Sequence, residues 1–149
     1  MLHRELTGFV IGQAYQVHNI LGHGFLESIY EGSLFKRLTD AGLKVERQKK
    51  IKVFFEGVLV GFFYADLVVN DILILELKAV RDFDPRYSAQ LINYLKACNI
   101  EIGLLINFGM SVSVKRCTAS NQKEEYFETL SNEVLEALKN PIDTTYMNP

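Results

Sequence analysis

The chain has 149 residues, of which 48% are hydrophobic and 23% are charged, so it is long enough to bury one core and too apolar to be disordered. Its 16 lysines and arginines against 18 aspartates and glutamates exclude a strongly basic surface, so any site for a polyanion must be local. No run approaches the roughly 18 apolar residues of a membrane-spanning helix. Two cysteines and a start unlike a signal peptide predict a reducing, cytoplasmic location.

The first part of the chain has the period of helices. Apolar residues recur at helical spacing up to Leu21, and the glycines of the following LGHG stretch end this first helix. A second helix is predicted over 26–41, where Gly42 provides the stop. The two helices are expected to form a hairpin.

The period then changes to two, which predicts a three-stranded antiparallel meander over 45–55, 58–69 and 72–80. Its third strand is apolar on both faces, so it is expected to be central and covered on both sides. Asp84 and Pro85 supply an N-cap and a first-turn proline for a third helix. A buried strand over 102–108, a short edge strand over 112–116 and a final helix over 123–139 complete one domain, with its core at about 1–116 and a helical extension at about 121–140.

Charged residues interrupt the most apolar strands. Glu76 and Lys78 lie in LILELKAV. Two interpretations fit that fragment equally well: a functional pair of charges, or a half-exposed strand that turns both charges to water. Asp66 interrupts the preceding strand, in FFYADLVV. A two-residue turn at Asn70 and Asp71 would put Asp66 and Glu76 on opposite faces of the sheet. We therefore predict a three-residue turn or a β-bulge, which brings the two carboxylates together.

The helices add further candidates. At 100° per residue, Glu27 falls in the apolar stripe of the second helix, although a first-turn glutamate that bends to water near the helix dipole is the alternative. Gln90 and Tyr94 lie four apart and share a face of the third helix, a pair that alone is more often structural. The carboxylates of Glu27, Asp66 and Glu76, without histidine, favour Mg²⁺ or Mn²⁺ over Zn²⁺.

Assembled in chain order, these motifs resemble the PD-(D/E)xK nuclease superfamily, which has the restriction-endonuclease-like fold. GFLESIY is similar to the GxxExxY signature of a small bacterial family, and YADLVV, ILELKAV, AQLINYLKA and GLLINFG follow in family order. Two departures are present: Ala65 stands where the superfamily has proline, and Tyr64 where many GxxExxY members have arginine.

The resemblance implies an α/β fold with an αβββαβ core, in which helices flank a central mixed sheet and extra helices lie at both ends. It implies Glu27, Asp66 and Glu76 as metal ligands and Lys78 as the catalytic lysine. Gln90 and Tyr94 resemble the QxxxY motif of RecB-like nucleases.

The implied activity is metal-dependent hydrolysis of phosphodiester bonds in nucleic acid, in DNA processing or defence. DNA is favoured over RNA as the substrate. Two neighbouring carboxylates favour the charged form of Lys78, so we expect it to orient water or stabilise negative charge rather than act as a base. A catalytically silent module that binds nucleic acid or protein is the alternative. The final helix is either a dimer face or a lid on the core. The residues expected to contact phosphate are Arg81, Arg86, Lys49, Lys50 and Lys52.

Overall fold

The computed structural model describes residues 3–119, and every structural statement below concerns that part of the chain. Three helices and five strands lie in it, in the predicted order. They are α1 (Arg4–Leu21), α2 (Glu27–Asp40), β1 (Val45–Phe55), β2 (Val58–Val69), β3 (Leu73–Lys78), α3 (Pro85–Cys98), β4 (Ile102–Phe108) and β5 (Val112–Thr118). The predicted helix over 123–139 falls outside the described residues. Within residues 3–119, no helix is long and apolar enough to cross a membrane.

The five strands form a single mixed sheet in the order β1-β2-β3-β4-β5. Neighbouring strands are antiparallel except β3 and β4, which are parallel because α3 connects them as a crossover. Nearly every residue of β3 and all of β4 are buried, as expected for strands that are covered on both faces. The predicted restriction-endonuclease-like α/β class, with its central mixed sheet and flanking helices, is confirmed.

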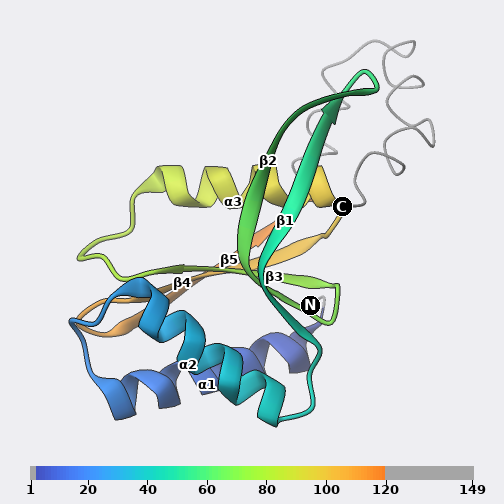
Figure 1. The fold of residues 1–149 in the computed structure, drawn as a ribbon. Coiled ribbons are helices and arrows are strands. Elements are labelled where there is room, and N and C mark those ends of the chain that lie inside the picture. The colour runs from blue at the N-terminus through green and yellow to red at the C-terminus, as the bar shows by residue number, and fades with distance from the viewer. Residues whose placement is uncertain (1–2, 120–149) are drawn as a thin grey trace.

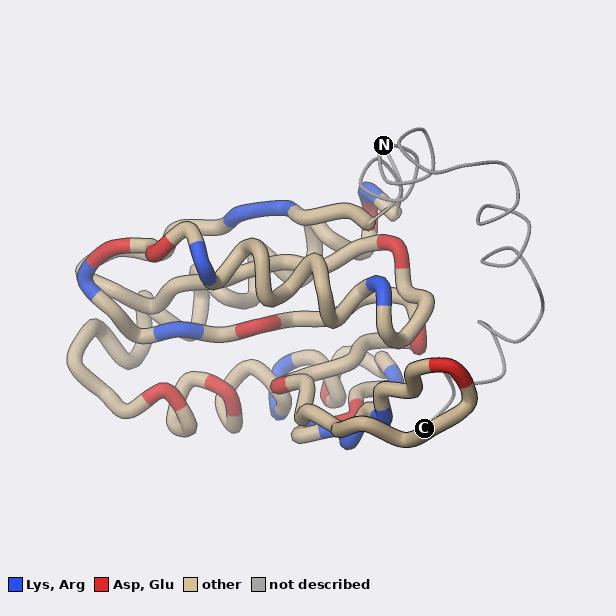
Figure 2. Tube along the Cα trace, turned by 90° about the horizontal axis from the view of Figure 1, so that it is seen from above, with Lys and Arg blue, Asp and Glu red and all other residues tan. Residues whose placement is uncertain are grey.

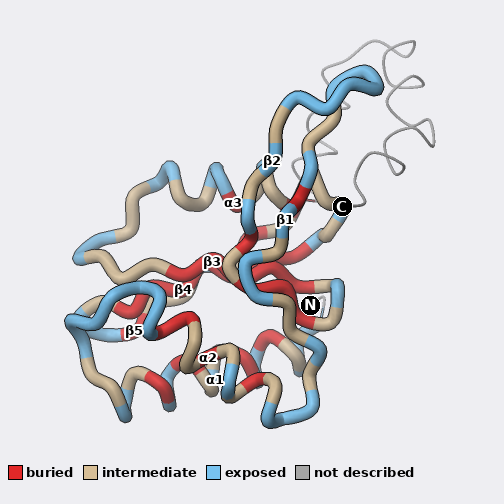
Figure 3. Tube along the Cα trace, viewed as in Figure 1, coloured by how far each residue is buried: buried red, intermediate tan, exposed pale blue. Residues whose placement is uncertain are grey.

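Helices cover the sheet on both faces, and each face has its own core (Figure 1). The α1–α2 hairpin lies against one face and α3 against the other, while the buried residues gather between the layers (Figure 3). Tyr30 of α2 stacks on Phe108 of β4 with ring centroids 4.6 Å apart. On the other face, Leu91 and Leu95 of α3 are fully buried against the sheet.

The connection between β2 and β3 confirms the predicted three-residue turn. Val69 pairs with Leu73, which leaves Asn70, Asp71 and Ile72 in the turn. Asn70 and Asp71 have positive φ values of 53° and 59°, a conformation that asparagine and aspartate tolerate better than most residues. Extending this register by one residue beyond the Leu67–Leu75 pair places Asp66 opposite Glu76.

The β1–β2 ribbon leaves the sheet close to Asp66. Strand β2 pairs with β3 only over Leu67–Val69, although it continues back to Val58 beside β1 (Figure 1). Ala65 packs in the core under α3, whereas Leu67 packs in the core under α1 and α2. Strict alternation would place these two residues on one face, so the strand rotates at Asp66. The sheet therefore forks there.

Candidate active site at the fork of the sheet

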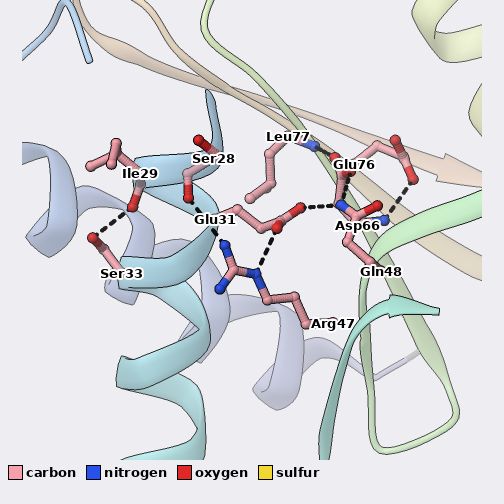
Figure 4. A network of polar contacts seen from close by, with 9 residues as sticks. All are labelled: Ser28, Ile29, Glu31, Ser33, Arg47, Gln48, Asp66, Glu76 and Leu77. Carbon is pink, nitrogen blue, oxygen red and sulfur yellow. Dashed lines mark hydrogen bonds and ion pairs between the residues drawn. The ribbon is translucent and has the colours of Figure 1, made fainter. Parts of the chain in front are cut away.

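The carboxylates of Asp66 and Glu76 meet where β2 separates from β3. The Leu77 amide donates to Asp66 Oδ2 at 2.8 Å, and the Asp66 amide donates to Glu76 Oε1 at 3.2 Å (Figure 4). Each carboxylate thus accepts a bond from the backbone of the other strand, in place of the ladder bonds that end at Leu67. Buried amides need such partners, so this exchange stabilises the fork and fixes both side chains.

The environment of this pair favours protonation. Burial, followed by the negative charge of Asp66, raises the pKa of Glu76 to about 8. Burial also raises the pKa of Asp66, while the hydrogen bond from the Leu77 amide lowers it. The two groups therefore resist carrying full negative charge together unless a positive charge compensates them.

Lys78 shares the α3-facing side of β3 with Glu76. Ile74 packs in the core under α3, and alternation places residues 76 and 78 on the same side. The Lys78 ammonium lies 4.6 Å from the centroid of the Tyr87 ring of α3. Its charge lowers the pKa values of Glu76 and Asp66, so it acts electrostatically on the carboxylate pair.

On α2, the prediction that Glu27 is buried in the apolar stripe was wrong. Glu27 is the first residue of the helix and is exposed, whereas Tyr30 and Leu34, further along the same stripe, are buried. Partial burial nevertheless raises its pKa, with Lys78 lowering it and Asp66 and Glu31 raising it further. Glu27 is thus electrostatically coupled to the carboxylate pair at the fork, although it does not touch it.

Glu31, one helical turn after Glu27, is the buried carboxylate of α2, with 6% of its surface exposed. The Nε of Arg47 donates to Glu31 Oε2 at 2.7 Å, and the Nε2 of Gln48 donates to Glu31 Oε1 at 2.6 Å (Figure 4). Sequence reasoning missed Glu31, yet the signal was available: it lies in the same stripe, between Tyr30 and Leu34.

Gln48 connects α2 to the carboxylate pair. Besides its bond to Glu31, its Nε2 donates to Asp66 Oδ1 at 3.1 Å. Its φ of 51° lies in the left-handed region, which is uncommon for glutamine, and the residue has no partner in the β1–β2 ladder opposite Asp66. The strained residue and the rotation of β2 thus coincide at the fork. No local sequence pattern indicates this conformation, so Gln48 was not predicted.

Gln90 and Tyr94 lie on α3 beside the site. Burial, then the charges of Glu76 and Asp66, raise the pKa of Tyr94, while a hydrogen bond with the Gln90 side chain acts in the opposite direction. The Tyr94 ring stacks on Phe63 of β2 with centroids 3.7 Å apart. Tyr94 is therefore within the electrostatic reach of the carboxylates, and its stack on Phe63 anchors α3 to the ribbon.

The residues predicted to contact phosphate have different surroundings. Lysines and arginines are spread over several elements rather than gathered on one (Figure 2). Arg86 forms an ion pair with Asp84 at 2.6 Å, and Lys49 pairs with Glu46 at 3.2 Å, so both are engaged. Lys50 and Lys52 are exposed on the ribbon.

Arg81 is the predicted phosphate contact nearest a concave surface. It lines a groove of about 570 Å³ at the carboxyl ends of β3 and β4, together with Gly24 and Phe25 of the turn before α2. The chain enters this groove at Ala79, directly after Lys78, the last residue of β3. Ligands of α/β proteins commonly bind at the carboxyl ends of parallel strands, so the groove is a candidate path to the site.

The donor chemistry of the carboxylate pair fits a hard divalent cation. Mg²⁺ is usually held in proteins by one or two carboxylates, with water completing its coordination. Asp66 and Glu76 supply that number of ligands, and their raised pKa values indicate a place where a cation would be favourable. The expected cluster of three is not assembled, since no group of three or more such side chains in residues 3–119 is arranged to hold a metal ion.

Comparison with known proteins places this geometry in context. Searches of curated proteins and of solved structures found no significant match. A sequence model described as the PD-(D/E)XK nuclease superfamily matches residues 4–117, a range that begins with α1 and includes the whole fork. Because this match extends over well more than half of the chain and the mixed sheet brings together the acidic residues of β2 and β3, the protein belongs to the PD-(D/E)XK nuclease superfamily.

Proposed function

We propose that the protein is a metal-dependent nuclease that hydrolyses phosphodiester bonds, and that it belongs to the GxxExxY group of its superfamily. Superfamily membership supports nuclease activity in general, a nucleic-acid substrate and the use of divalent metal. The observation that carries the proposal is the meeting of Asp66 and Glu76 at the fork, with Lys78 on the same strand face as Glu76.

In this proposal Asp66 and Glu76 hold Mg²⁺ or Mn²⁺. When bound, the ion supplies charge neutralisation at the phosphate and activation of water. The backbone bonds from Leu77 and Asp66 hold the two carboxylates in place before the ion arrives, which limits reorganisation. Lys78, which lowers the pKa values of both carboxylates, orients the reacting groups or stabilises negative charge on the phosphate.

The remaining predicted residues complete the site. Glu27, which is electrostatically coupled to Asp66, acts as a third ligand by approaching when substrate and ion bind. Gln90 positions Tyr94, which faces the carboxylates from α3. Arg81 contacts a substrate phosphate in the adjoining groove. DNA rather than RNA is proposed as the substrate, and the cytoplasm as the location.

One observation favours a second candidate function, a binding module without catalysis. Both carboxylates are engaged by backbone amides, and Glu27 is not gathered with them into a three-ligand cluster within the described part of the chain. A fork stabilised in this way would persist without any metal. In that case nucleic acid would bind to the groove and the ribbon, and no phosphodiester bond would be cleaved.

A cleavage assay with conservative variants separates the two functions. Labelled single- and double-stranded DNA and RNA are incubated with the full chain and Mg²⁺ or Mn²⁺, with and without a chelator. We expect metal-dependent cleavage that falls by about 10²-fold or more in Asp66→Asn, Glu76→Gln and Lys78→Met. The amide variants retain a hydrogen-bond acceptor for the backbone, so the fork is expected to fold.

Asp40→Asn is the matched control, because Asp40 is exposed on α2 and pairs only with Lys36 in the described residues. Its rate should equal that of the wild type. Cleavage that persists unchanged in all three site variants would contradict the assigned site. Absence of metal-dependent cleavage on every substrate, with nucleic-acid binding retained, would establish the binding module instead.

A further inference from the structure

One face of the β1–β2 ribbon beyond the fork is covered by no other element within residues 3–119. Beyond the fork, the two strands pair only with each other, and the ribbon projects from the body of the molecule with mostly exposed residues (Figure 3). Such a ribbon has two faces. Ile51, Phe63 and Ala65 turn one of them toward α3, where Phe63 stacks on Tyr94.

The opposite face carries aromatic rings and cations together. Lys50 pairs across the strands with Tyr64, and Lys52 pairs with Phe62. The Phe62 and Tyr64 rings make an edge contact at 5.7 Å, and the Lys50 ammonium lies 4.2 Å from the Phe62 centroid. Phe62 is 53% exposed and Tyr64 49% exposed. We name these four residues the ribbon platform.

The two lysines of the ribbon platform are free to bind an anion. No carboxylate lies within ion-pair distance of Lys50 or Lys52 among residues 3–119. Their neighbour Lys49, on the other face, does pair with Glu46. The chain has a net charge of −2, but the charges of these two lysines are not neutralised by a paired carboxylate. The ribbon platform is therefore a locally positive surface that is complementary to a polyanion.

The ribbon platform adjoins the fork. Tyr64 precedes Asp66 by two residues on β2, and Lys50 follows Gln48 by two residues on β1. At the typical rise of about 3.3 Å per residue in a strand, the Tyr64 and Asp66 backbones are separated by only about 7 Å. The ribbon platform therefore reaches the carboxylate pair at Asp66, where β2 rotates between the two faces of the sheet.

We propose that the ribbon platform binds single-stranded nucleic acid, with bases on the Phe62 and Tyr64 rings and phosphates against Lys50 and Lys52. Exposed aromatic rings beside cations are the combination with which proteins hold unpaired strands, since paired bases offer no free face for stacking. The inference rests on the proposed function, because it names the substrate class of that same site: single strands or unpaired ends rather than intact duplex.

The test measures binding without cleavage. Fluorescence anisotropy of labelled dT20, rU20 and a duplex of equal length is followed with the full chain in chelator, so that metal-dependent hydrolysis is absent. We expect tighter binding of the single strands than of the duplex. Tyr64→Leu and Phe62→Leu, which keep apolar area but lose the ring, should weaken single-strand binding by about five-fold or more each.

Further variants separate stacking from charge. Tyr64→Phe keeps the ring and should retain wild-type affinity, which also shows that the site tolerates substitution. Lys52→Ala should reduce the slope of log affinity against log salt by about 0.7. Tyr15→Leu on α1 and Lys115→Ala on β5 are the matched controls, because both residues are exposed and lie on other elements.

Two results would overturn the inference: equal affinity for single strands and duplex, or affinities unchanged in the ring variants. A self-associated chain that dissociates in Phe62→Leu would also overturn it, because the face would then be a protein contact. Selective binding without cleavage in Mg²⁺ would refute the proposed nuclease function while leaving the ribbon platform intact. Cleavage that is unaffected by the ring variants would refute the ribbon platform as the substrate site and leave the proposed nuclease function intact.

Discussion

At the scale of single residues, the fork gives Asp66 and Glu76 two roles at once. Their carboxylates accept bonds from backbone amides that have lost their ladder partners, which stabilises the fold. The same burial makes their ionisation unfavourable, so the pair is prepared for a cation. A structural role and a chemical role are therefore not alternatives here, because the backbone bonds hold the groups that the chemistry needs.

The raised pKa of Glu76 predicts how stability depends on pH in the absence of divalent metal. The folded state holds this proton up to about pH 8, whereas the unfolded chain releases it near the ordinary glutamate value of 4.5. Between these values the folded state binds more protons, so the free energy of unfolding should fall as the pH rises. Urea unfolding in chelator, measured from pH 4.5 to 8.5, checks this.

The variant Glu76→Gln isolates the contribution of this group. Because glutamine does not titrate, the decline in stability over this window should become shallower, with the residual slope due to Asp66 and Glu27, whose pKa values are also raised. Glu5→Gln, in the exposed first turn of α1, should reproduce the wild-type slope. A slope that is identical in Glu76→Gln and wild type would contradict the buried, protonated state of Glu76.

At the scale of elements, α3 and the two central strands position the site. The Asp84 side chain caps α3 by accepting from the Arg86 amide, and Pro85 occupies its first turn. Gly103 of β4 lets α3 approach closely, since a Cβ there would lie 2.9 Å from Cδ1 of Leu91. The close contact of α3 with the sheet is what brings Tyr94 near enough for the charges of Glu76 and Asp66 to raise its pKa.

Two glycine substitutions of opposite sign test this packing. Gly103→Ala should lower the free energy of unfolding by about 1–3 kcal/mol, because the buried Leu91 must shift. Gly12→Ala, on the exposed side of α1 where a Cβ meets nothing within 4 Å, should raise it by roughly 0.5–1 kcal/mol through helix propensity. Urea unfolding measures both. A neutral Gly103→Ala would show that α3 packs less closely than described.

At the scale of the whole molecule, stability is expected to be uneven. Strands β3 and β4 are buried between two cores, whereas the ribbon beyond the fork is exposed and pairs only with itself. Local opening is easiest where few apolar contacts must be broken. We therefore expect the end of the ribbon to open more readily than the part that holds the carboxylates.

Native-state hydrogen exchange measures this difference. Amides over 54–60 at the end of the ribbon should exchange orders of magnitude faster than those over 73–78 and 102–108. Addition of dT20 in chelator should slow exchange on the ribbon alone if the ribbon platform binds it. Protection at the end of the ribbon equal to that of β4, in the free protein, would show that this face is covered in solution.

Much of the fold follows from local patterns. The strands over 45–55, 58–69 and 102–108 were predicted with the bounds that the structure shows, because the period-two alternation and the turn residues at 56–57 are local signals. The three-residue turn was predicted from the requirement that Asp66 and Glu76 share a site, and it is confirmed. The central position of β3 followed from its apolar residues on both faces.

The sequence by itself determined the order of the elements, the class of the sheet and the acidic residues of β2 and β3, because periodicity, turn chemistry and misplaced charge are readable along the chain. Only the tertiary structure decided that Glu31 rather than Glu27 is the buried carboxylate of α2, and that Gln48 bridges it to Asp66. The physical reason is that burial on a helix and a left-handed glutamine both depend on contacts with segments that are distant in the sequence.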